Sequence, residues 1–137
     1  MKVLGIEIKG TCAIFCALEE NTTINDITGK FTKLEIKDDE NGEEIHEFVD
    51  ILHSHFDEMQ FAKIAILKRV KSVKARFPPS PISFKLEGLI QMYKNTEISF
   101  VPPQTIRAFL KKNTNTFNPK FDYQKSSSEL AYYLLKR

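Results

Sequence analysis

The fold is decided by a stretch near the start of the chain, KVLGIEIKGTCAIFCAL at residues 2–18. It contains two runs rich in leucine and β-branched side chains, 2–9 and 11–18, which are separated only by Gly10. Two such runs joined through a glycine are typical of a β-hairpin, because glycine reaches the backbone angles of a tight turn. We therefore expect the chain to open with two antiparallel strands.

Outward from this hairpin, the pattern of apolar residues predicts the remaining elements. Alternation predicts a third strand at 30–37, after a polar turn at 21–29, and an apolar run predicts a buried parallel strand at 61–67. A fifth strand is expected at 97–101. Apolar side chains recur at helical spacing in four further segments, 43–59, 81–94, 104–112 and 126–137.

The order of these elements, β-β-β-α-β-α-β-α-α, predicts a single α/β domain over residues 1–137, since no linker divides the chain. The three strands that open the chain should be antiparallel. The two strands that follow should be added in parallel through crossover connections. We expect one mixed five-stranded sheet with helices on both faces.

The composition of the 137 residues is that of an ordinary globular protein, with a formal net charge of +2. No apolar run approaches the ~18 residues that cross a membrane, and Glu7 lies where a secretory signal would be apolar. Cys12 and Cys16 would be about 13 Å apart on one strand, too far for a disulfide, and we interpret them as core residues. We therefore expect a soluble, cytoplasmic protein without a membrane partner.

Charge is distributed unevenly along the chain. Residues 1–67 carry a net charge of −8 and residues 68–137 a net charge of +10. The most basic segment is KRVKSVKAR at 68–76, followed by FPPSP at 77–81. Clustered cations of this kind are typical of a segment that contacts nucleic-acid phosphates. The segment fits equally well a solvated loop, or one neutralised by the acidic half of a second copy.

Three short motifs occur in order along the chain: LGIEIKG at 4–10, SFKLEG at 83–88 and VPPQTIRAFLK at 101–111. The first resembles the Gly-Ile-Asp-x-Gly first strand of the RuvC resolvase-like branch of the ribonuclease H-like superfamily. The second resembles the start of the helix after the fourth strand, and the third resembles a strand-to-helix step whose basic residues approach nucleic acid. The resemblance covers nearly the whole chain and implies a ribonuclease H-like fold. The same motifs also resemble a small bacterial family of unknown function.

The resemblance implies a candidate active site. Nucleases of this superfamily cut phosphodiesters with two divalent ions held by about three or four carboxylates. Glu7 stands at the position of their first catalytic aspartate, so the resemblance implies that it is a catalytic residue and a Mg²⁺ ligand. An acid in an apolar strand costs several kcal/mol unless it is paired or bound, so Glu7 also fits one half of a structural ion pair.

The last helix offers one further acid, Glu129, as a second catalytic residue. It follows Ser126 by three residues, which is the spacing of a capping box, in which the glutamate reaches back to the serine amide. Glu44 and Glu47 in segment 43–59 could take the place of the missing acid, but glutamates at such positions are more often solvated residues of a helix face.

Lys68 argues against catalysis, because RuvC-like enzymes carry a glutamate at the end of the fourth strand. A cation there repels a metal and would neutralise Glu7 directly. We therefore expect nuclease activity to be weak or lost, and DNA or RNA to bind to cations on the carboxyl side of the sheet. These cations are Lys9, Lys68, Arg69, Lys71, Lys74, Arg76, Lys85, Arg107 and Lys111.

Two alternative functions are compatible with the sequence. One is a non-enzymatic interaction module, either a homodimer that pairs its acidic and basic halves or a partner of another charged protein. The other is an active Mg²⁺-dependent nuclease that uses Glu7 together with other acids.

Overall fold

The structure is a computed structural model that describes residues 1–69, 80–114 and 117–137. Its strands are β1 (Lys2–Lys9), β2 (Cys12–Glu20), β3 (Ile24–Asp26), β4 (Lys33–Glu35), β5 (Lys63–Leu67) and β6 (Ile98–Val101). Its helices are α1 (Gly42–Met59), α2 (Pro81–Gln91), α3 (Pro103–Lys112) and α4 (Lys125–Lys136), with a short 3-10 helix, η1 (Asp122–Gln124), directly before α4.

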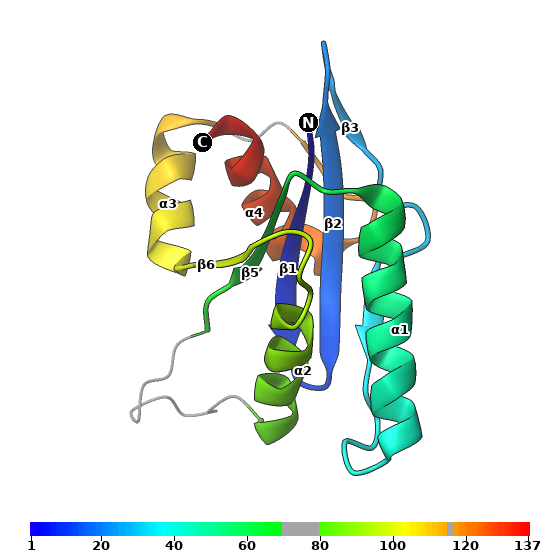
Figure 1. Cartoon of the computed structure of the whole chain (residues 1–137). Helices are drawn as coiled ribbons and strands as arrows, with labels where there is room; N and C mark the ends of the chain where they lie inside the picture. The colour runs from blue at the N-terminus through cyan, green and yellow to red at the C-terminus, as the bar shows by residue number, and fades with distance from the viewer. Residues whose placement is uncertain (70–79, 115–116) are drawn as a thin grey trace.

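The predicted fold class is confirmed. The described strands form one mixed sheet in the order β3-β2-β1-β5-β6, and β4 also pairs with β2 (Figure 1). β1 and β2 form the expected antiparallel hairpin, in which Gly10 has a φ of +62°. β5 is added in parallel next to β1, and β6 is added in parallel next to β5.

The sheet has six strands where the sequence predicts five. Ile24–Asp26 forms a short strand within the expected turn, and the strand predicted at 30–37 is reduced to Lys33–Glu35. The reason is that these two strands pair with opposite ends of β2. Between them, the Thr28 hydroxyl accepts a hydrogen bond from the Ala17 nitrogen at 2.9 Å, so a side chain replaces the strand pairing there.

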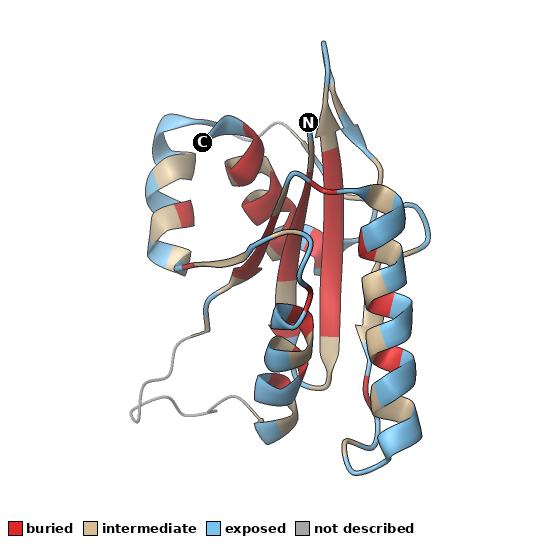
Figure 2. Ribbon diagram, viewed as in Figure 1, coloured by how far each residue is buried: buried red, intermediate tan, exposed pale blue. Residues whose placement is uncertain are grey.

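Two hydrophobic cores lie on the two faces of the sheet, as expected for a sheet covered on both sides. α1 and α2 bury Phe48, Leu52 and Leu86 against one face. α3 and α4 bury Ile106 and Leu130 against the other. Figure 2 shows buried residues along β1 and β2 and on parts of the helices around them. No helix within the described ranges is long and apolar enough to cross a membrane.

The sheet and a helix approach each other closely at Gly5, where β1 passes under α4. A Cβ atom at this position would lie 2.8 Å from the Ala131 backbone nitrogen and closer still to the Ser127 carbonyl oxygen. Only glycine allows a strand and a helix to approach this closely. The contact therefore places the start of α4 over the second half of β1.

We expect Gly5→Ala to destabilise the protein by about 1–3 kcal/mol or more, because the added methyl group would meet backbone atoms that have no free space to move into. Denaturant unfolding would measure this loss. Gly88→Ala is the matched control, since a Cβ at Gly88 in α2 meets nothing within 4 Å. That change should stabilise the helix by about 0.5–1 kcal/mol. Equal unfolding midpoints for the two variants would contradict the close contact.

Candidate site: a carboxylate pair at the end of β1

Glu7 lies near the end of β1 on the face of the sheet that α4 covers. Successive side chains of a strand point to opposite faces, and Ile6 and Ile8 pack into the core beneath α1 and α2. Glu7 therefore shares the other face with Val3 and Gly5. Its side chain is half-buried.

Two residues of the first turns of α4 influence the Glu7 carboxylate. The Ser126 hydroxyl donates a hydrogen bond to it, and the charge of Glu129 lies near enough to act on it. We call Glu7 and Glu129 the carboxylate pair. Lys9, two residues further along β1, adds a nearby positive charge.

The surroundings raise the pKa of Glu7 above its ordinary value of 4.5, mainly because burial disfavours the charged form. The hydrogen bond from Ser126 and the charge of Lys9 act against this rise in pKa, whereas Glu129 adds to it as a like charge. The site therefore keeps two acids close together with only partial compensation.

The predicted capping box of Ser126 and Glu129 is wrong. α4 already begins at Lys125 and follows η1 without a break, so Ser126 lies inside the first turn. The preceding turn is closed instead by Gln124, whose side-chain oxygen accepts a hydrogen bond from the Phe121 backbone nitrogen at 3.2 Å. This arrangement leaves the Ser126 hydroxyl available to Glu7.

The β5 residue next to Glu7 is Leu67, not Lys68. β1 and β5 pair in register up to Ile6 and Ile66, so the following residue, Leu67, lies beside Glu7 on the α4 face. Leu67 accordingly packs against the core under α4. Lys68 is exposed beyond the strand, where its backbone nitrogen bonds to the Val101 oxygen. The prediction that Lys68 lies beside Glu7 in place of an acid is therefore wrong.

The two alternative candidate acids, Glu44 and Glu47, lie on α1, which covers the opposite face of the sheet. The Glu44 carboxylate accepts hydrogen bonds from the backbone nitrogens of Lys37 and Asp38. Neither acid is therefore placed to add a third carboxylate to the site of Glu7 and Glu129.

These donors do not fit a centre with two metal ions. Within residues 1–69, 80–114 and 117–137, no three His, Cys, Asp or Glu side chains are grouped so that they could hold a metal ion. The carboxylate pair and the Ser126 hydroxyl fit at most one Mg²⁺, because Mg²⁺ commonly uses one or two carboxylates and fills its other positions with water and phosphate oxygens.

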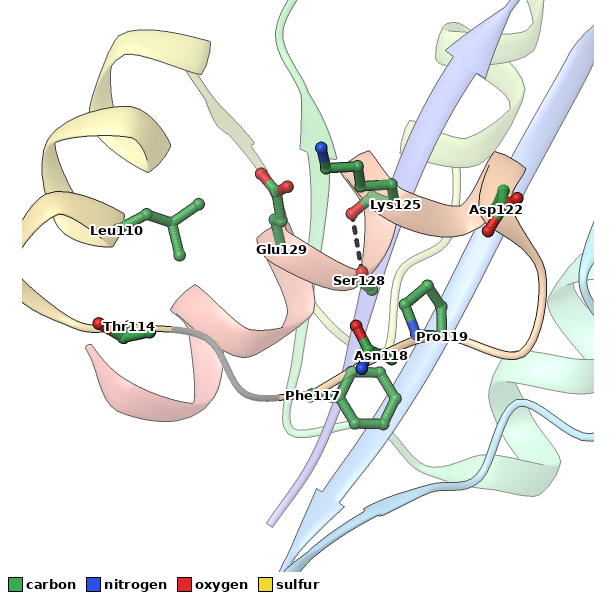
Figure 3. A pocket seen from close by; sticks show the side chains of 9 residues that line it. All are labelled: Leu110, Thr114, Phe117, Asn118, Pro119, Asp122, Lys125, Ser128 and Glu129. Carbon is green, nitrogen blue, oxygen red and sulfur yellow. Dashed lines mark hydrogen bonds between the residues drawn. The ribbon is translucent and has the colours of Figure 1, made fainter.

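A pocket of about 440 Å³ is lined by residues of α3, of α4 and of the segment between them (Figure 3). Glu129 lines it from α4 and Leu110 from α3, and Phe117, Asn118 and Pro119 form another wall. A ligand in this pocket would therefore contact one acid of the pair.

The predicted phosphate-binding cations occupy different surroundings. Lys9 is exposed near the carboxylate pair, Lys68 is exposed at the end of β5, and Arg107 and Lys111 are exposed one helical turn apart on α3. Lys85 is paired with Asp39 at 3.3 Å. The predictions for Lys71, Lys74 and Arg76 lie outside the described residues.

Arg69 is held inside the protein, where the sequence predicted a phosphate contact. Its guanidinium forms an ion pair with Glu87 at 2.6 Å, and the two side chains are only 13% and 14% exposed. It also donates to the Ser83 hydroxyl and lies 4.4 Å from the centre of the Phe84 ring. Arg69 thus fastens the end of β5 to α2, and we leave it out of the proposed binding surface.

The comparisons with known structures identify the class of fold. Thermus thermophilus RuvC matches with a TM-score of 0.73 at 9% identity, over 99% of this chain and 97% of that chain. The same protein in complex with a Holliday junction substrate matches at 0.70, with 9% identity and 99% and 96% coverage. The fowlpox virus Holliday junction resolvase matches at 0.52, with 11% identity and 99% and 98% coverage. The fold is therefore RuvC-like, of the ribonuclease H-like type.

The family follows from the sequence. Residues 1–134 match the family model described as protein of unknown function, DUF3010, and the chain belongs to that family. No curated protein is significantly similar to the chain.

We expect the Arg69–Glu87 pair to contribute more to stability than the exposed pair Lys85–Asp39. Glu87→Gln should cost roughly 3 kcal/mol, because it leaves a largely buried guanidinium without its counter-charge. Lys85→Ala should cost less than about 1 kcal/mol, since its ion pair is solvated. Urea unfolding of both variants would compare the two losses, and losses of equal size would contradict the anchoring role of Arg69.

The stability conferred by residue 7 should depend on pH. The pKa of Glu7 is higher in the folded chain than in the unfolded chain, so its favourable contribution is present below pH 4.5 and is lost as pH rises through the folded pKa. Glu7→Gln should therefore be more stable than the wild type at about pH 7 and should lose this advantage below about pH 4.

Thermal unfolding at several pH values would measure this difference. Glu47→Gln, on the exposed side of α1, is the control and should follow the wild type across the range. A Glu7→Gln variant that is less stable than the wild type at neutral pH would show that the carboxylate is favourably ionised.

Proposed function

We propose that this protein binds nucleic acid at the edge of the sheet where β1, β5 and β6 end, and that it cleaves phosphodiesters weakly or not at all. It does so as a single domain over residues 1–137. The cations of this surface are Lys9 and Lys68 at the ends of β1 and β5, together with Arg107 and Lys111 on α3, which begins at that edge and runs back toward the side where β1 begins (Figure 1). All four are exposed. Cations that neutralise phosphates give binding that depends on salt and is indifferent to sequence.

The observation that carries the proposal is the incomplete acid site. The charge of Glu129 acts on Glu7 at the end of β1, but the neighbours Ser126 and Leu67 supply a hydroxyl and an apolar side chain in place of further carboxylates. Two acids are too few for the two ions that such a cleavage uses, whereas the surrounding cations suffice to hold a phosphate backbone. The resolvase folds that match this chain support a nucleic-acid ligand by analogy only.

A second candidate function is cleavage with a single Mg²⁺. The carboxylate pair favours it, because a divalent cation would relieve the repulsion between two neighbouring acids. In this case Glu7 and Glu129 would hold the ion together with a phosphate oxygen of the substrate. Glu7→Gln would then abolish the reaction while leaving binding in the absence of metal intact.

The test is fluorescence anisotropy with labelled four-way junction DNA, duplex DNA and RNA at increasing salt. The affinity should fall steeply with salt, and the double variant Arg107→Ala/Lys111→Ala should reduce the slope of log K against log salt by about 2. Lys94→Ala is the control, because Lys94 is exposed in the segment between α2 and β6 and is not one of the four cations of the proposed surface.

Two results decide between the candidates. Affinity that is absent, or that does not change between about 50 and 200 mM salt, would overturn nucleic-acid binding. If the wild type cleaves the junction efficiently in Mg²⁺ and Glu7→Gln eliminates this cleavage, the protein is the single-metal nuclease and not a protein that only binds nucleic acid.

A further inference from the structure

An exposed pair of aromatic rings precedes α4. Phe121 and Tyr123 are 40% and 38% exposed, which is unusual for side chains of this size. Their ring centres are 5.3 Å apart and their planes differ by only 6°. The Tyr123 hydroxyl donates a hydrogen bond to the Thr32 hydroxyl at 2.9 Å, which fixes the ring beside β4. We call Phe121 and Tyr123 the aromatic platform.

A lysine ammonium group lies over each ring of the platform. The Nζ atom of Lys33 lies 5.2 Å from the centre of the Tyr123 ring, and that of Lys120 lies 5.4 Å from the centre of the Phe121 ring. Both lysines are exposed. A surface cation–π contact is weaker than the stacking of a nucleobase on an aromatic ring, so a base can displace these ammonium groups.

The platform lies on the same face of the sheet as the carboxylate pair. Glu7 is directly opposite Ile14 in β2, and Ile14 is directly opposite Lys33 in β4. Residues paired in this way point to the same face, and two strand spacings place Lys33 roughly 10 Å from Glu7. From the platform, the chain continues through η1 into the first turn of α4, which contains Ser126.

A pocket of about 390 Å³ borders this platform. Lys30 and Lys120 line it together with the polar side chains of Thr28, Thr32 and Gln124. Asp26 also lines it, but its carboxylate already accepts hydrogen bonds from the Thr28 nitrogen and hydroxyl. The pocket thus places two lysines beside polar side chains, which suits the phosphate of a nucleotide.

We propose that the aromatic platform stacks an unpaired base, and that Lys33, Lys120 and Lys30 bind the phosphates on either side of it. The bases of an uninterrupted duplex present no free ring face, so stacking of this kind selects single-stranded segments. This inference rests on the proposed function and narrows its ligand to nucleic acid that contains unpaired nucleotides. The register places Lys33 on the same face of the sheet as Glu7, so the bound segment would lie beside the carboxylate pair.

Photo-cross-linking tests the contact directly on the wild-type chain. The probe is a single-stranded oligonucleotide of about 20 nucleotides that carries 5-iodouridine. Trypsin cuts after Lys120 and Lys125, so a cross-link to the platform appears on the peptide of residues 121–125. We expect that peptide to be the main adduct. An adduct confined to other peptides would overturn the inference.

Affinity measurements provide the second test. Phe121→Leu keeps an apolar side chain but removes the ring, and it should weaken binding of the single strand by about fivefold or more while changing duplex affinity less than about twofold. Phe121→Tyr should retain the wild-type affinity. The control is Met92→Leu at the end of α2, since Met92 is also exposed, at 62%.

The outcomes separate this inference from the proposed function. If Phe121→Leu binds both ligands as the wild type does, with normal salt dependence, the platform is not a base-stacking site but nucleic-acid binding stands. If the wild type binds neither single strand nor duplex at low salt, the proposed function fails and this inference fails with it. Circular dichroism of each variant checks that the fold is intact.

Discussion

The contact between Gly5 and α4 is the constraint on which the site depends. The backbone of α4 lies so near β1 that no side chain fits between them at this position. The atoms that a side chain would meet belong to the helix backbone, which cannot turn aside as the tip of a long side chain can. The contact therefore sets the position of α4 over β1, and Glu7, two residues further on the same face, meets Ser126 as a result.

The carboxylate pair is an unfavourable arrangement for stability alone. Burial and the second acid both oppose ionisation of Glu7, and the Ser126 hydroxyl and Lys9 offset these effects only in part. The largely buried Arg69 shows the contrasting case, because a carboxylate faces it directly at 2.6 Å. A polar site that lacks such close compensation is typical of a surface that meets a ligand.

The fold and the chemistry of the site carry different information. The backbone superposes on RuvC over 99% of the chain, although only 9% of the residues are identical. A likeness of this kind says how the strands and helices are arranged, but the side chains must establish the activity. Here Leu67 and Ser126 flank two acids, and we therefore emphasise binding of nucleic acid over its cleavage.

The sequence by itself determined the order of the helices and of the strands other than β3, together with the hairpin at Gly10, because apolar periodicity and glycine turns are local properties. It could not reveal β3, since the pairing depends on which part of β2 is free to accept a strand. It also assigned Arg69 to the surface, although Glu87, 18 residues away, holds it inside. Only the tertiary structure decided that Leu67 and not Lys68 lies beside Glu7, because a shift of one residue in a parallel pair exchanges the two faces of the strand.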